Sequence, residues 1–171
     1  DAGVHGFSVT LKTAGTESIT VSDTLLPVAG SAAIAVQHAP ASGFQLAALP
    51  ATAEAGQPLS LAISARDAFG NLATSYAGSA ALTSADPTDI LPAAGGFTAG
   101  VRVVSLAFVK AGTHVATVAE VGGGIAAVDT TSVAVGAAPP FRIDVSAAGA
   151  STIAGTAGAI TVKLLDRHGN T

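Results

Sequence analysis

The sequence predicts an all-β protein built from tandem antiparallel β-sandwiches, with one complete unit between two partial ones. Three observations support this prediction. Apolar and polar residues alternate with a period of two, turn-forming residues divide the alternating segments, and several segments recur about 97 positions later. The 20 glycines and 8 prolines among 171 residues indicate many turns, and no segment carries the apolar stripe of an amphipathic helix.

The alternation gives each expected strand in turn. Residues 59–66 place Leu59, Leu61 and Ile63 on one face and small or polar residues on the other, which is typical of a strand with one buried side. Phe7 and Leu11 lie in a similar segment near the start of the chain. Further strands are expected around Ile19 and Val21, Ile34 and Val36, Ala80 and Leu82, and Val104, Leu106 and Phe108.

Internal repetition sets the length of the unit. Residues 12–16 (KTAGT) return as residues 109–113 (VKAGT), displaced by 97 positions, and residues 62–71 match residues 161–170 at a displacement of 99. We assign the difference to two extra residues near 146–150. On this alignment Ile34 falls on Thr131, Val36 on Val133 and Phe44 on Phe141.

The repeat divides the chain into three parts. Residues 1–40 form the C-terminal part of one unit, residues 41–138 a complete unit, and residues 139–171 the beginning of another. Proline-bearing segments at 38–43 and 136–140 mark the boundaries and favour stiff connections.

One motif occurs at the same place in two units. Asp67, Gly70 and Asn71 follow an alternating strand, and Asp166, Gly169 and Asn170 repeat them. Aspartate can accept backbone N–H bonds from the next residues, while glycine and asparagine tolerate positive φ, so the motif predicts a structural turn. The alternative is a calcium site, although calcium needs six or more oxygen ligands. Its weak candidates are Asp67, Asp86 and Asp89.

Composition argues against several functions. A net charge of −4 and the lack of a basic stripe exclude nucleic acid as an expected partner. No apolar run is long enough to span a membrane, no G-x-S-x-G nucleophile motif is present, and Asp86 with Asp89 is interpreted as a solvated turn. We therefore expect a protein that is not an enzyme and has no cofactor, calcium being the one alternative.

The histidines do not recur between the copies and are expected to be scattered surface residues. They are His5, His38, His114 and His168, and their counterparts on the alignment are Arg102, Val135, Glu17 and Phe69.

Taken in order, several segments carry a family resemblance. They are residues 55–59 (AGQPL), 63–71 (ISARDAFGN), 76–78 (YAG), 84–87 (SADP) and 110–113 (KAGT). The chain resembles the immunoglobulin-like repeats of bacterial surface proteins of the invasin and intimin type. This resemblance implies immunoglobulin-like sandwiches and a non-enzymatic, extracellular role at the cell surface, as part of a stalk, fibre or filament that holds another domain away from the cell.

Two alternatives stay open. The chain could be an adhesive or calcium-rigidified module that binds carbohydrate or protein, with Tyr76 and Phe69 as the few aromatic candidates for a sugar platform. The expected partners are neighbouring repeats or further copies of the chain. Each partial unit would expose strand edges, so copies could also join head to tail by strand addition into a filament, unless the sequence is a window of a longer fibrous protein.

Overall fold

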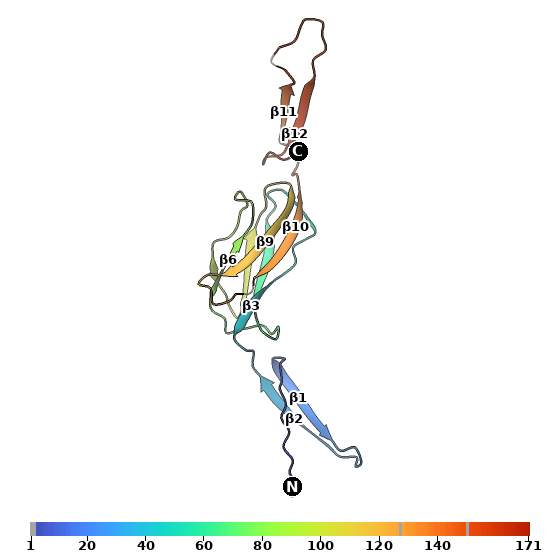
Figure 1. The fold of residues 1–171 in the computed structure, drawn as a ribbon, viewed down its shortest axis with the longest axis vertical. Helices are drawn as coiled ribbons and strands as arrows, with labels where there is room; N and C mark the ends of the chain where they lie inside the picture. The colour runs from blue at the N-terminus through green and yellow to red at the C-terminus, as the bar shows by residue number, and fades with distance from the viewer. Residues whose placement is uncertain (1–2, 127, 150) are drawn as a thin grey trace.

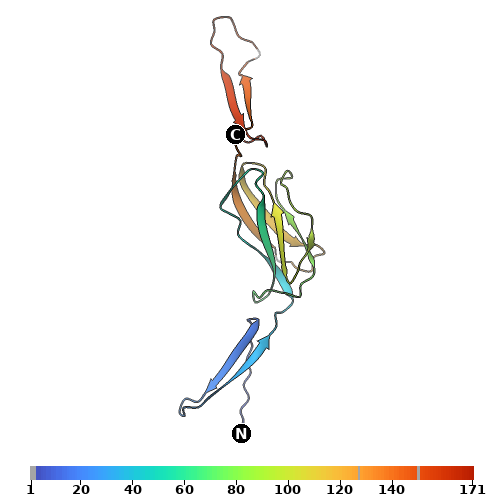
Figure 2. The same cartoon turned by 180° about the vertical axis from the view of Figure 1, so that it is seen from behind.

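A computed structural model describes residues 3–126, 128–149 and 151–171, and every regular element within these segments is a β-strand. Twelve strands form four sheets, so the all-β prediction is confirmed. The sheets follow one another along the long axis: a hairpin, a two-sheet central unit and a second hairpin (Figures 1 and 2). None of the described residues belongs to a helix with the length and hydrophobicity that crossing a bilayer requires.

The central unit contains two sheets. The smaller has the strand order β3-β5-β8, and the larger has the order β4-β10-β9-β6-β7. Their bounds are β3 Ala41–Leu46, β4 Thr52–Glu54, β5 Leu59–Asp67, β6 Ser79–Thr83, β7 Gly95–Gly96, β8 Val101–Leu106, β9 Gly112–Glu120 and β10 Asp129–Gly136. The flanking hairpins pair β1 Gly15–Ser22 with β2 Ala29–Val36, and β11 Arg142–Ala147 with β12 Ile160–Leu165.

The core of the central unit lies between its two sheets. In β5 the side chains alternate between buried and partly exposed, and Leu61, Ile63 and Ala65 are fully buried. Val118 and Val133 on the larger sheet belong to the same apolar cluster. The alternation predicted for residues 59–66 is therefore confirmed, and burial of this face stabilises the unit.

One strand pair departs from the predicted antiparallel arrangement. Strand β4 pairs with β10 in parallel, with Thr52 opposite Ala134. The chain passes from β3 in one sheet to β4 in the other before it turns at Ala55 and Gly56 into β5. Strand β4 thus extends the edge of the larger sheet and is not paired with β3 or β5, its neighbours in sequence.

The strand predicted around Phe7 and Leu11 is wrong. Residues 4–12 have no regular structure, and the Phe7 side chain is 77% exposed. Their counterpart in the central unit, β8, is held by hydrogen bonds to β5. Among the described residues before β3, only β1 and β2 form strands, so this segment meets no counterpart of β5 there.

The two extra residues of the central unit also lie elsewhere than predicted. Gly15 pairs with Val36 in the N-terminal hairpin, whereas the equivalent Gly112 pairs with Val135, so the pairs are 21 and 23 positions apart. The insertion therefore falls in the loop between β9 and β10, and its prediction near 146–150 is wrong. Hairpin loops absorb such changes without disturbing the ladder. The structural alignment pairs Ile34 with Val133, Val36 with Val135, His38 with Ala137 and Phe44 with Ile143.

Candidate functional site

The repeated motif forms a closed turn at the end of β5. One carboxylate oxygen of Asp67 accepts hydrogen bonds from the backbone N–H groups of Phe69 and Asn71, each at 2.9 Å. The Gly70 N–H donates to the Asp67 carbonyl at 3.1 Å, and Gly70 has a φ of 84° that a residue without a Cβ adopts without strain. These residues therefore build the turn from their own backbone and one carboxylate.

The other oxygen of Asp67 fixes the connection to the preceding hairpin. It accepts from the Ala39 N–H and from Nδ2 of Asn71, each at 2.9 Å. Burial alone would raise the pKa of the Asp67 carboxyl, but the hydrogen bonds from Asn71, Ala39 and Phe69 outweigh it and lower the pKa to about 2. The carboxylate is thus ionised and holds four donors at neutral pH.

Asn71 extends from this turn to the preceding hairpin. Its Nδ2 donates to the Lys12 carbonyl at 2.8 Å, and its Oδ1 accepts from the Ala14 N–H at 2.9 Å. The side-chain amide thereby bonds to the backbone on both sides of Thr13, as a neighbouring strand would. We name this arrangement, the Asp turn together with the Asn bridge to the preceding loop, the junction clasp.

A second junction clasp joins the central unit to the C-terminal hairpin. Asn170 Nδ2 donates to the Val109 carbonyl at 2.9 Å, and its Oδ1 accepts from the Ala111 N–H at 2.8 Å. Asp166 accepts from the N–H groups of Ala138, His168 and Asn170 and from Nδ2 of Asn170, at 2.8 to 2.9 Å. Burial opposes ionisation here too, yet these bonds hold the pKa of the Asp166 carboxyl far below its usual value.

The third residue of each turn adds a contact that differs between the junctions. At the first, the Lys12 Nζ lies 5.7 Å from the centre of the Phe69 ring, a cation–π arrangement. At the second, the His168 imidazole lies directly against Gly56, where any Cβ would overlap it. The backbone bonds are common to both junctions, whereas this side-chain packing is specific to each.

The structure places the six predicted turn residues at these two junctions. The sequence predicts the turn but not the hydrogen bonds of its asparagine to the preceding unit, because the partners of Asn71 lie 57 and 59 positions earlier in the chain. A signal was present, since the KTAGT and VKAGT segments that receive the asparagines were themselves found to recur.

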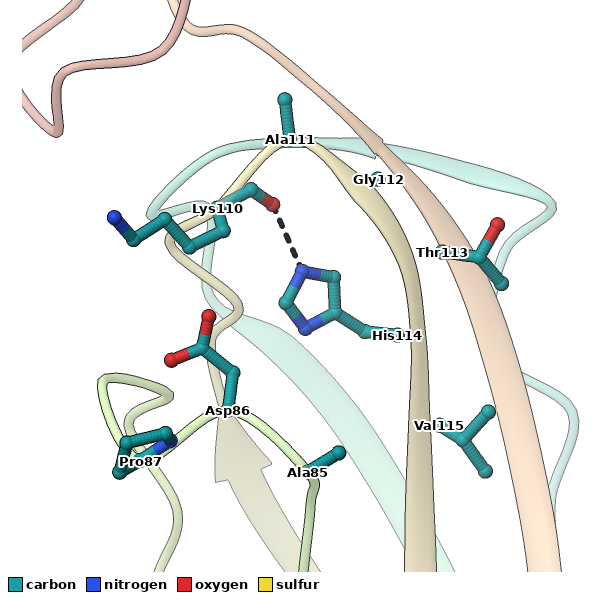
Figure 3. Close-up of a pocket in the computed structure, with 9 residues that line it drawn as sticks. All are labelled: Ala85, Asp86, Pro87, Lys110, Ala111, Gly112, Thr113, His114 and Val115. Carbon is teal, nitrogen blue, oxygen red and sulfur yellow. Dashed lines mark hydrogen bonds between the residues drawn. The ribbon is translucent and has the colours of Figure 1, made fainter.

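Two predictions about exposed polar residues are wrong. His114 is only 8% exposed, and the Asp89 side chain is fully buried beside it, with Nδ1 of the ring 3.0 Å from the carboxylate. The same ring places Nε2 at 2.9 Å from the Lys110 carbonyl. His114 lines a surface pocket between residues 85–87 and 110–115, where Figure 3 shows its ring directed toward the Lys110 carbonyl. Alternation could have revealed His114, since it precedes Ala116 and Val118 on the inward face of β9.

The weak calcium candidates do not form one site. Asp67 belongs to the first junction, Asp89 binds His114, and an Asp86 oxygen accepts from the Thr88 N–H and hydroxyl at 2.8 and 2.6 Å. The described part of the chain contains no group of three or more His, Cys, Asp or Glu side chains that could hold a metal ion. Their carboxylates are engaged by protein donors.

The two aromatic candidates for a sugar-binding platform, Tyr76 and Phe69, also lie at different places in the central unit. Tyr76 stacks edge-on against Phe44 and Phe97, with centroids 5.7 and 5.1 Å away, and its hydroxyl donates to Glu120 at 2.6 Å. Phe69 lies at the first junction beside Lys12. Tyr76 therefore contributes to packing, and the two rings do not share a binding face.

Comparison with known proteins gives similarity in structure only. No protein-family model matches the chain, and no match is found among curated proteins. Domains 4–9 of the surface layer protein SbsC align over 92% of this chain and 25% of that one, at 16% identity and a TM-score of 0.45. SbsC domains 5–6 align over 77% and 65%, at 16% identity and a TM-score of 0.44.

A third solved structure belongs to another class of protein. The β-glucuronidase of Parabacteroides merdae aligns over 63% of this chain and 15% of that one, at 13% identity and a TM-score of 0.46. The chain thus spans a quarter or less of the SbsC domain 4–9 structure and of the glucuronidase. At these values the similarities assign neither a family nor an activity, and the resemblance to invasin and intimin repeats stays a prediction.

Proposed function

We propose that the chain is a non-enzymatic structural segment of an extracellular stalk or fibre at a bacterial cell surface, in which junction clasps hold successive β-sandwich units in line. The observation that carries this proposal is the recurrence of the same cross-junction bonds at two places. Asn71 and Asn170 bind the backbone of the preceding unit with the same atoms, at distances that agree within 0.1 Å.

Each clasp restrains two segments at once. The aspartate holds the linker through the Ala39 or Ala138 N–H, and the asparagine holds a loop of the preceding unit. A short linker without such bonds leaves two domains free to reorient. Hydrogen bonds of this kind contribute about 0.5–1.5 kcal/mol each, so several together are enough to favour one orientation.

Four acidic side chains are engaged by hydrogen bonds within the protein. Asp67, Asp166, Asp89 and Glu120 all accept hydrogen bonds from within the chain. Only 11% of the residues are charged. Such use of polar groups favours a mechanical role, because each group that stabilises the rod is one that is not available to bind a substrate.

Small-angle X-ray scattering of the full chain tests the proposal. Replacing both asparagines, Asn71→Ala with Asn170→Ala, should lower the maximum dimension and broaden the distance distribution as the junctions loosen. The amides of Ala14 and Ala111 should lose protection from hydrogen exchange, because each donates to one of these side chains. Thr88→Ala is the matched control, since it removes a side-chain hydrogen bond within the central unit. Unchanged scattering and unchanged protection in the double variant would refute the clasp.

Head-to-tail association is a second candidate, which the exposed faces of the hairpins favour. Ile160 and Val162 are 68% and 55% exposed, whereas their counterparts in β5, Leu61 and Ile63, are fully buried. In the central unit β5 pairs with β8, with Leu61 opposite Val104. Residues 4–9 of a second copy correspond to β8, so strand addition would place its Phe7 opposite Ile160.

Sedimentation velocity at micromolar concentrations tests this association. Concentration-dependent oligomers that Ile160→Lys abolishes would support strand addition between copies. Ser105→Lys, on an exposed position of β8 in the central unit, is the control for added charge. A monomer at every concentration would exclude it and leave the clasp proposal untouched.

A further inference from the structure

His114 lies between two hydrogen-bond acceptors. Its Nδ1 is 3.0 Å from Oδ2 of Asp89, and its Nε2 is 2.9 Å from the Lys110 carbonyl oxygen. A carbonyl has no proton to give, and an ionised carboxylate only accepts. A neutral imidazole carries one N–H, so both bonds form together only when the ring is the imidazolium cation.

The Lys110 carbonyl lies in the middle of the segment that the second clasp binds. Asn170 donates to the carbonyl of Val109 and accepts from the N–H of Ala111, one residue to each side. His114 reaches this segment from within the central unit, and Asn170 reaches it from the next hairpin. The histidine therefore supports the backbone that the asparagine recognises.

We propose that His114 is a positioning residue that makes the second junction sensitive to pH, holding residues 109–111 in shape for Asn170 while its ring is protonated and paired with Asp89. The inference rests on the proposed function of the clasp. When the ring loses a proton, one nitrogen turns a lone pair toward an acceptor oxygen, and that bond is lost. Within the pH range where histidine titrates, the junction is thus firmer at the acidic end and loosens as the pH rises.

Two carboxyl groups and one lysine lie around the ring, so the acidic groups outnumber the basic one. Asp89 and Asp86 approach from the loop between β6 and β7, and Lys110 lies just before β9. The pKa of Asp86 is lowered, chiefly by hydrogen bonds from Thr88 and further by the positive charges of Lys110 and His114.

Apolar groups complete the surroundings of the ring. The Phe108 ring lies 4.8 Å from it, and the paired strand β10 places Val133 opposite His114. Neither can take up a proton.

The first junction is a built-in control. Its segment from Lys12 to Ala14 is bound by Asn71 in the same way, but Glu17 stands at the position of His114. Glutamate does not titrate between about pH 5 and pH 8, where histidine does. The two junctions of one molecule should therefore respond differently to the same change of pH.

Nuclear magnetic resonance on the full chain tests the proposal. Imidazole ¹⁵N shifts report the charge of His114 from about pH 5 to pH 9, a range that covers histidine titration. Exchange rates corrected for intrinsic pH dependence report the protection of the Ala111 and Ala14 amides. Loss of a bond to a charged group should lower Ala111 protection about tenfold as His114 deprotonates, with Ala14 unchanged. In His114→Gln, which lacks the titrating group, Ala111 protection should be low and independent of pH.

The outcomes separate the two proposals. A His114 ring that is neutral throughout, or Ala111 protection that stays constant while the ring titrates, overturns the pH-dependent role. Asn170→Ala tests the clasp itself. If this variant leaves the protection of the Ala111 amide unchanged, the clasp proposal fails. If the variant removes this protection but the protection in the wild type does not vary with pH, only the role of His114 fails. The wild-type titration decides even where His114→Gln does not fold.

Discussion

The side-chain nitrogen Nδ2 of Asn71 lies 2.8 Å from the carbonyl oxygen of Lys12, which precedes it by 59 positions. The equivalent bond from Asn170 to Val109 is 2.9 Å long and joins residues 61 positions apart. The difference of two is the insertion in the loop between β9 and β10. The loop absorbs the extra residues, so the unit changes length while the junction keeps its geometry.

Acid should weaken the first junction through Asp67. Its pKa is about 2 in the folded chain against an ordinary value of 3.8. A carboxyl group whose pKa is lower in the folded than in the unfolded chain stabilises the folded state at pH values above 3.8. This stabilisation is lost as the pH falls from 3.8 toward 2. We expect Asp67→Asn to have a lower melting temperature than the wild type at pH 7, by a margin that narrows below pH 3.8.

Thermal melts across this pH range check the prediction. Asp144→Asn, at an exposed position of β11, controls for the loss of one negative charge and should show no such convergence. A constant difference between wild type and Asp67→Asn down to pH 2 would contradict the assigned role of the carboxylate.

The buried face of β5 should dominate the stability of the central unit. Ile63 is fully buried between the sheets, so Ile63→Ala should cost about 2–5 kcal/mol through lost burial and a residual cavity. Val103, 66% exposed on β8, is the matched control, and Val103→Ala should change stability by less than about 0.5 kcal/mol. Urea unfolding measures both, and equal costs would show that the core lies elsewhere.

The predicted strands that the structure confirms have their pairing partners in the same unit. The β5 segment alternates over its whole length, because one face of it meets the core, and this pattern is local. The segment around Phe7 carries the same pattern but no partner to pair with, so alternation there did not produce a strand. Periodicity indicates which face a strand would bury, whereas pairing depends on the rest of the chain.

Alignment by residue identity also had a limit. A displacement of 97 without a gap matches Phe44 with Phe141, yet strand pairing places Ile143 at that position. In a chain rich in alanine, valine and glycine, chance matches at a wrong displacement are frequent. The sequence predicts the Asp turn of the clasp but not the Asn bridge. The bridge depends on contacts between units, and no local sequence pattern encodes such contacts.

Calcium should leave the stability of the chain unchanged. Asp67 already accepts four hydrogen bonds, and the Asp89 carboxylate is buried against Ser84 and His114 at 2.7 and 3.0 Å. Calcium needs six to eight oxygen ligands and would have to displace these donors. Melting temperatures in millimolar calcium and in chelator should therefore agree. A rise with calcium that Asp86→Asn abolishes would restore the calcium-rigidified alternative, because binding to the folded state raises stability.

Gly56 should be the position where a single methyl group disturbs the second junction. Its φ is 77°, which disfavours any Cβ, and a Cβ there would overlap the His168 ring. Gly123, in the loop between β9 and β10, has a φ of 78° with no atom near its Cβ position. Both Gly56→Ala and Gly123→Ala should cost about 1–2 kcal/mol from backbone strain, but only the first should displace His168.

The two effects are separable by experiment. Urea unfolding measures the strain that the two variants share, and the imidazole resonances of His168 report the contact that only Gly56→Ala disturbs. Adding His168→Ala to Gly56→Ala removes the ring, so the double variant should recover the part of the cost that exceeds that of Gly123→Ala. If the His168 resonances respond equally to both glycine variants, the ring does not rest on Gly56 and the second junction is packed differently.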